Sequence, residues 1–136
     1  MTMIQRSLVA GFFYFLTVFA CAFVLGTIRV LWILPATGPL IAVLLELPLV
    51  LLLSWWVSGV LIRRCAVSAA APPRLVMGGL AFTLLMVAEL ALTIFAFGGT
   101  PATFLAGLAT TEGLVGLAGQ IVFGLMPLIR VQPFAR

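Results

Sequence analysis

Residues 8–34 read LVAGFFYFLTVFACAFVLGTIRVLWIL, an apolar run that contains a single charged side chain, Arg29. A transmembrane helix needs about 20 predominantly apolar residues. Three further apolar runs lie at about 40–62, 75–97 and 113–129. None shows the two-residue alternation of an outer-membrane barrel. The sequence therefore predicts an all-α polytopic membrane protein, with four transmembrane helices in one antiparallel bundle that forms a single domain over residues 1–136.

The composition favours a membrane protein and excludes several classes of function. Of the 136 residues, 65% are hydrophobic and 7% are charged, and the mean hydropathy is +1.37. A soluble domain is about half apolar and about a quarter charged. The chain has no His, Lys, Asp or Asn, which excludes imidazole ligands, Ser-His catalysis and lysine Schiff bases. We therefore expect no cofactor, no metal site and no nucleic-acid partner, and the inventory does not favour an enzyme.

The positions of the arginines predict the orientation of the chain. Cytoplasmic loops of membrane proteins are enriched in Lys and Arg. If both termini are cytoplasmic, the outer loops carry no Arg, and the inner face carries Arg6, Arg63, Arg64, Arg74, Arg130 and Arg136. We expect residues 8–34 to be retained and not cleaved as a signal peptide, because the apolar run continues past a lipoprotein-like box at residues 18–21. The sequence thus predicts a membrane protein with both termini in the cytoplasm.

Prolines and short segments predict where the helices end. The first helix is expected to stop at Pro35, and Pro48 is expected to kink the second helix. Residues 104–109 are apolar but too short to span a membrane, so they form either a short interfacial helix or an extension of the fourth helix. Cys21 and Cys65 lie at different depths, and we expect no disulfide between them.

Four polar side chains are predicted to share one layer near the outer face. With a rise of about 1.5 Å per residue, each lies roughly 8–12 Å from the outer end of its helix. They are Arg29, Glu46, Glu89 and Gln120. Thr93 shares a helix face with Glu89, and Glu112 shares one with Gln120, because residues four apart stack on a helix. Ionisable groups inside a membrane are costly and are often functional, so these six residues are the candidates for binding a ligand or a proton.

The charge count of this layer favours binding of a positive charge. Arg29 supplies one positive charge, whereas Glu46 and Glu89 supply two negative charges. A low-dielectric layer disfavours this excess, which a proton or a cation would neutralise. The alternative interpretation is a structural Arg–Glu–Glu network that fixes the register of the helices.

One part of the chain resembles a known group of proteins. The stretch Gly26-Thr27-Ile28-Arg29-Val30-Leu31, then Pro35 and Gly38, is followed by Leu44-Leu45-Glu46-Leu47-Pro48-Leu49. This pattern is similar to a family of small four-helix bacterial inner-membrane proteins that is uncharacterised and has no assigned function. The resemblance implies that Arg29 and Glu46 matter as a pair, and it implies no activity.

Three functions are compatible with these features. The first is proton-coupled transport or small-molecule binding by a homo-oligomer, with Glu46 and Glu89 as the titrating pair and Arg29 as the counter-charge. The second is an accessory subunit or assembly factor of a larger membrane complex. The third is a protein that binds or modifies a lipid or another small hydrophobic ligand. The lipid bilayer is the partner that all three share.

Overall fold

The computed structural model describes residues 1–130, and within that range the chain is helical and contains no β-strand. Four helical segments, Met3–Thr37, Pro39–Cys65, Ala71–Ala96 and Thr111–Ile129, are long and apolar enough to cross a membrane. This fits an integral membrane protein and confirms the prediction of an all-α chain with four such helices. Cys21 and Cys65 are free thiols.

The helical elements include two π-helical turns and two short helices besides the long ones. In chain order they are α1 (Met3–Ile28), η1 (Arg29–Ile33), α2 (Leu34–Thr37), α3 (Pro39–Cys65), α4 (Ala71–Ala91), η2 (Leu92–Ala96), α5 (Pro101–Leu108) and α6 (Thr111–Ile129). The apolar segment at 104–109 thus belongs mostly to a separate short helix, α5, which is the first of the two alternatives that the sequence left open.

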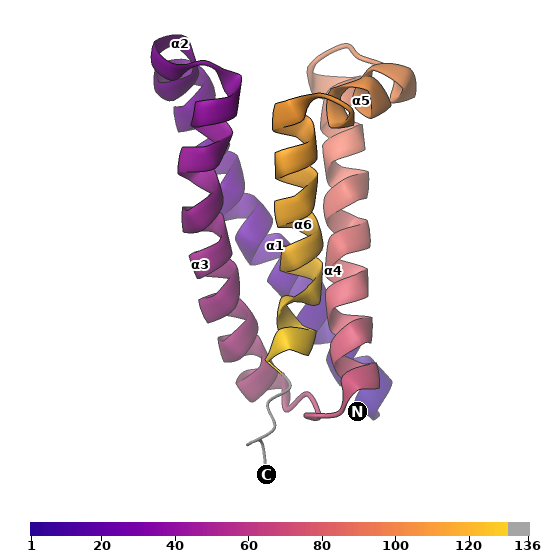
Figure 1. Cartoon of the computed structure of the whole chain (residues 1–136). Helices are drawn as coiled ribbons and strands as arrows, with labels where there is room; N and C mark the ends of the chain where they lie inside the picture. The colour runs from indigo at the N-terminus through magenta and orange to yellow at the C-terminus, as the bar shows by residue number, and fades with distance from the viewer. Residues whose placement is uncertain (131–136) are drawn as a thin grey trace.

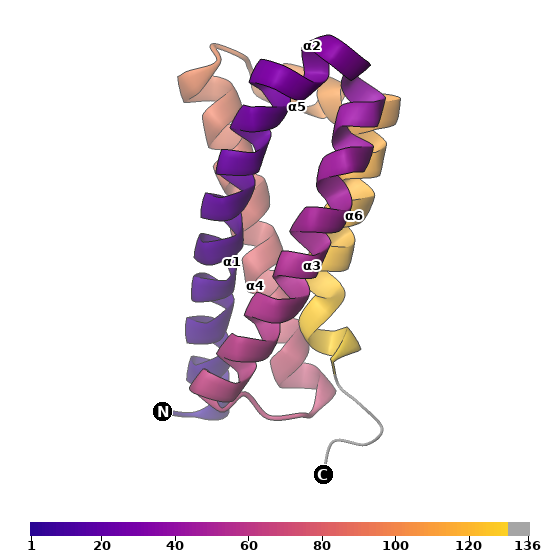
Figure 2. The same cartoon turned by 90° about the vertical axis from the view of Figure 1, so that its left-hand side faces the viewer.

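The long helices surround a common interior. Each packs against two neighbours, in the order α1–α4–α6–α3 around the molecule. The N-terminus and the end of α6 lie at one end, which we call the terminal end, and α2 and α5 lie at the opposite end, which we call the α2/α5 end (Figures 1 and 2). Toward the α2/α5 end, α1 and α3 diverge from α4 and α6 (Figure 1).

Glycines bring the helices close together in the terminal half. A Cβ atom on Gly11 would lie 2.6 Å from the carbonyl oxygen of Met77, and one on Gly78 would overlap the carbonyl oxygen of Gly124. The backbone of α4 is therefore in near contact with the backbones of both α1 and α6. The buried core occupies the same region and includes Ala10, Tyr14, Val57, Met77, Ala81, Phe123 and Met126. The bundle is thus tight at the terminal end and looser at the other.

Both ends of the first transmembrane segment differ from the prediction. The segment does not stop at Pro35 but at Gly38, whose φ of +85° lies in the region that favours glycine. Pro35 is tolerated because it lies in the first turn of α2, directly after the wide turn η1, where its missing N–H costs little. The segment also begins earlier, at Met3, because Thr2 and Gln5 form a capping box.

Candidate functional site

The four polar side chains of the predicted layer line a single cavity. Its volume is about 170 Å³, and all four long helical segments line it, mainly with residues from their α2/α5 halves. Each long segment contributes one polar group, namely Arg29 from η1, Glu46 from α3, Glu89 from α4 and Gln120 from α6. The shared layer that was inferred from helix rise alone therefore corresponds to one site.

Within this site the four groups form two pairs. Arg29 Nε forms an ion pair with Glu46 Oε2, and the two side chains are 29% and 18% exposed. Gln120 Nε2 donates a hydrogen bond to Glu89 Oε1 at 2.6 Å. The first pair joins η1, which continues α1, to α3, and the second pair joins α4 to α6. Among residues 1–130, no cation forms an ion pair with Glu89.

The turn at Gly38 sets the first pair at a common depth. Arg29 lies nine residues before Gly38 and Glu46 lies eight residues after it. Because the two helices meet at that turn, nearly equal spacing places the two side chains at similar depth. Arg29 is also the first residue of η1, and π-helical turns occur frequently at functional sites.

The walls of the cavity are otherwise apolar. They include Val18, Leu47, Leu51, Leu85 and Phe123. Apolar walls with a few convergent polar groups are typical of sites for small ligands. Gly116 also lines the cavity, and no atom lies within 4 Å of the position where its Cβ would be. A larger side chain at position 116 would therefore fill the cavity without striking the backbone of another helix.

A buried aromatic pair closes the cavity toward the terminal end. Tyr14 is fully buried, and its ring stacks on that of Phe123 with centroids 4.3 Å apart. The Tyr14 hydroxyl donates to the carbonyl oxygen of Phe123 at 2.6 Å. That carbonyl is free because residue 127, which would donate to it in an unbroken helix, is a proline. We call this pair the Tyr14–Phe123 floor; sequence analysis missed it, although Pro127 inside an apolar run was the available signal.

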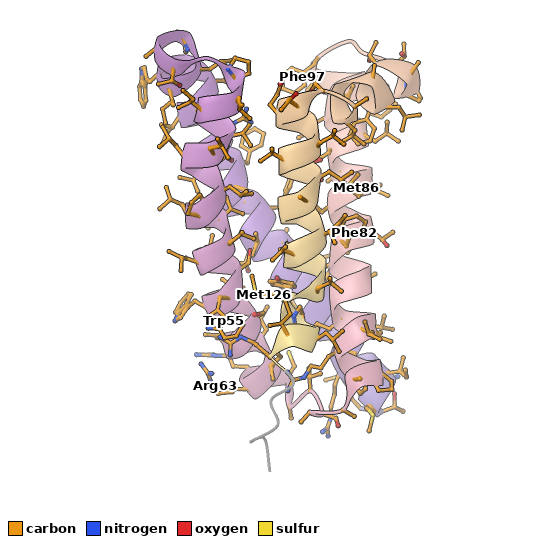
Figure 3. All side chains as sticks on the ribbon, viewed as in Figure 1. Trp55, Arg63, Phe82, Met86, Phe97 and Met126 are labelled. Carbon is orange, nitrogen blue, oxygen red and sulfur yellow. The ribbon has the colours of Figure 1, made fainter. Side chains whose placement is uncertain are left out.

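A second, larger cavity adjoins the first one. It has a volume of about 440 Å³ and is lined mainly by α1 and by α4 with η2. The two cavities share Ala22, Arg29, Glu46, Leu85 and Glu89. We call the second cavity the α1/α4 slot. Phe97 lines it at the α2/α5 end, where Figure 3 shows this side chain.

Thr93 and Glu112 lie outside both cavities. The Thr93 hydroxyl donates to the backbone carbonyl of Glu89 at 3.0 Å, and the Thr93 carbonyl accepts from the N–H of Gly99 at 2.7 Å. Thr93 therefore stabilises the end of the α4 segment. Glu112 lies in the first turn of α6, where a carboxylate interacts favourably with the helix dipole. Neither residue therefore belongs to the cavity on which the proposed function rests.

Two arginines of the terminal end bind backbone carbonyls, which sequence analysis did not foresee. Arg74 is buried and donates to the carbonyl of Pro127 at 3.1 Å. Arg130 donates to the carbonyl of Trp55 at 2.7 Å and lies 4.0 Å above the Trp55 ring. Burial lowers the pKa of Arg130 from its ordinary value, and the positive charge of Arg63 lowers it further. Figure 3 shows Trp55 and Arg63 near one another at this end.

The chemical groups of the site limit the kinds of ligand that it can hold. Within the described part of the chain, no three His, Cys, Asp or Glu side chains are grouped so that they could hold a metal ion. No family model, no curated protein sequence and no solved structure matches this chain. The cavity itself is therefore the feature that points to a function. It offers one neutralised carboxylate, one carboxylate without a counter-cation, an amide and apolar walls.

Proposed function

We propose that the chain is an integral protein of a bacterial inner membrane, with its helices antiparallel and both termini in the cytoplasm. The arginines of the terminal end support this orientation, because positive residues concentrate on the cytoplasmic side. Within residues 1–130 they are Arg6, Arg63, Arg64, Arg74 and Arg130. In this orientation the polar cavity lies in the outer leaflet. The proposal agrees with the resemblance to small four-helix inner-membrane proteins.

Within that membrane, we propose that the cavity binds a small amphiphilic molecule in exchange for a proton. The observation that carries this proposal is the unequal state of the two carboxylates. Arg29 neutralises Glu46, whereas Glu89 has only the neutral amide of Gln120 as its partner. The layer is electrically neutral when it holds one additional positive charge, which either a proton or a cationic ligand supplies.

Transport would require one more step than binding. The Tyr14–Phe123 floor separates the cavity from the terminal end. A ligand could cross the membrane only if this pair opened, and coupling to a proton would follow if opening were restricted to the neutral layer. We propose binding as the basic activity and proton-coupled transport, by a homo-oligomer, as its use.

Native mass spectrometry of the protein, extracted from its own membrane in a mild detergent, tests the binding function. We expect wild type to retain a small molecule or lipid, and Gly116→Leu to lose it because leucine fills the cavity. Gly79→Leu is the matched control, since position 79 also has open space around it but lies outside the polar cavity.

The same experiment tests the alternative role of accessory subunit. A stoichiometric protein partner that remains bound to Gly116→Leu, together with no small molecule on wild type, would contradict the binding function. The Arg–Glu layer would then serve to fix the helix register at a docking surface.

A further inference from the structure

We infer that the ligand is a protonated primary or secondary amine whose apolar body extends into the α1/α4 slot. This inference rests on the proposed function and names the class of molecule that the same cavity binds. It follows from the hydrogen-bonding groups that are still free in the cavity, from their charge and from the shape of the space beside them.

Beside Glu89, the free hydrogen-bonding capacity of the cavity consists of acceptors. Gln120 uses its Nε2 as a donor to Glu89, and its buried Oε1 has no hydrogen-bond partner among residues 1–130. Arg29 Nε also lacks a hydrogen-bond partner there, but its ion pair with the Glu46 carboxylate compensates its charge. A buried acceptor that lacks a donor is destabilising. The ligand that suits this arrangement brings N–H donors for Gln120 Oε1 and for the Glu89 carboxylate.

The net negative charge of the polar layer favours a positively charged hydrogen-bond donor over a neutral one. A protonated amine supplies N–H groups and the missing positive charge together, whereas an alcohol supplies a donor without the charge. A quaternary ammonium supplies the charge but has no N–H for Gln120 Oε1. A phosphate beside the amine would meet the excess negative charge of Glu46 and Glu89. This favours a free lipophilic amine over the headgroup of an aminophospholipid.

The sizes of the two cavities match an amine with an apolar body. The polar cavity, at about 170 Å³, is close to an engineered cavity of about 150 Å³ that binds benzene. It therefore has room for the ammonium group and one ring. The adjoining slot, at about 440 Å³, has walls that include Phe19, Phe23, Leu92 and Phe97. An apolar extension of the ligand would leave the polar cavity through this slot toward the lipid.

Isothermal titration calorimetry with three probes that share a phenethyl group tests the inference. The probes are phenethylammonium, its N,N,N-trimethyl derivative and 2-phenylethanol, each titrated into purified full-length protein in a mild detergent. We expect phenethylammonium to bind at least about tenfold more tightly than either analogue, which corresponds to about 1.4 kcal/mol. A para-butyl group on phenethylammonium should increase the affinity further, because the slot receives it.

Two matched variants locate the binding. Glu89→Gln should weaken phenethylammonium at least about tenfold and leave 2-phenylethanol unchanged, because only the ammonium needs the carboxylate. Glu112→Gln is the same substitution outside the cavity and should change neither affinity. Bicelles that contain phosphatidylethanolamine should not displace phenethylammonium, whereas displacement would identify a lipid headgroup as the source of the amine and overturn the choice of a free amine.

The remaining outcomes separate this inference from the proposed function. Equal affinities for the amine and its trimethyl derivative, with loss of both in Gly116→Leu, would overturn the inference and leave the binding function standing. No binding of any probe would also overturn it, and the native mass spectrum of wild type would still decide the proposed function. An equal loss in Glu89→Gln and Glu112→Gln would mean that the effect is not local, which likewise contradicts the inference.

Discussion

The hydrogen bond within the Tyr14–Phe123 floor should contribute measurably to the free energy of unfolding, and its geometry indicates by how much. The Tyr14→Phe variant lacks the hydroxyl that donates to the Phe123 carbonyl. Because Pro127 provides no helical donor for this carbonyl, the variant leaves it with neither of these two donors. An orphaned buried acceptor costs about 1–3 kcal/mol, and side-chain hydrogen bonds inside membranes average about 0.6 kcal/mol with a maximum of about 1.7. Because both rings are buried, we expect a loss near the upper end of the membrane range, about 1–2 kcal/mol.

A double-mutant cycle with Pro127→Ala isolates this hydrogen bond. Alanine at position 127 restores a backbone N–H, which can donate to the Phe123 carbonyl in the usual helical pattern. Tyr14→Phe should then cost about 1 kcal/mol less in the Pro127→Ala background than in wild type. The assay is reversible unfolding in mixed micelles, monitored by far-ultraviolet circular dichroism. An identical cost of Tyr14→Phe in both backgrounds would refute the view that Pro127 creates the acceptor which Tyr14 satisfies.

Three further predictions concern packing and charge. Gly78→Ala should destabilise the protein by at least about 2 kcal/mol, because the new Cβ would overlap the Gly124 carbonyl, whereas Gly79→Ala should be nearly neutral in the same unfolding assay. Arg29→Gln should cost about 3–5 kcal/mol because it leaves Glu46 unpaired, and adding Glu46→Gln should recover much of the loss; no recovery would show that the ion pair is not the source. Gly59→Ala should displace the Arg130 guanidinium from Trp55, since a Cβ there would lie 2.7 Å from the guanidinium carbon. An unchanged tryptophan emission relative to wild type would contradict that contact.

The number of helices that are long and apolar enough to span a membrane, and the common level of the four polar side chains along the bundle, could be predicted from the sequence. Both depend on quantities that are read along one chain, namely the length of an apolar run and the rise per residue. The helix ends were less predictable. Pro35 was expected to stop the first helix, but η1 and α2 accommodate it and Gly38 makes the turn. Local hydrogen bonds, such as those of the Thr2–Gln5 capping box, determine where a helix begins or ends. These bonds cannot be inferred from the apolarity of a segment.

The pairing of the polar groups could not be predicted from depth. Depth does not say which helices are neighbours, and in the order α1–α4–α6–α3 both α1 and α6 adjoin α3 and α4. Neighbourhood alone therefore does not decide that Gln120 pairs with Glu89 and Arg29 with Glu46. The positions of Thr93 and Glu112 could not be predicted either. Helical spacing places them on the same faces as Glu89 and Gln120, but both lie outside the cavities. The rotation of each helix about its axis is set by tertiary packing, such as the Gly78–Gly124 contact.

Binding of a cationic ligand at the Glu89 carboxylate can be observed directly. The chain has three glutamates and no aspartate, so protein labelled with ¹³C at the glutamate carboxyl gives one carboxylate signal each for Glu46, Glu89 and Glu112. The corresponding Glu→Gln variants assign the signals. On titration with phenethylammonium we predict that the Glu89 signal shifts most and the Glu112 signal does not move. A Glu89 signal that stays fixed at saturating phenethylammonium would contradict the account.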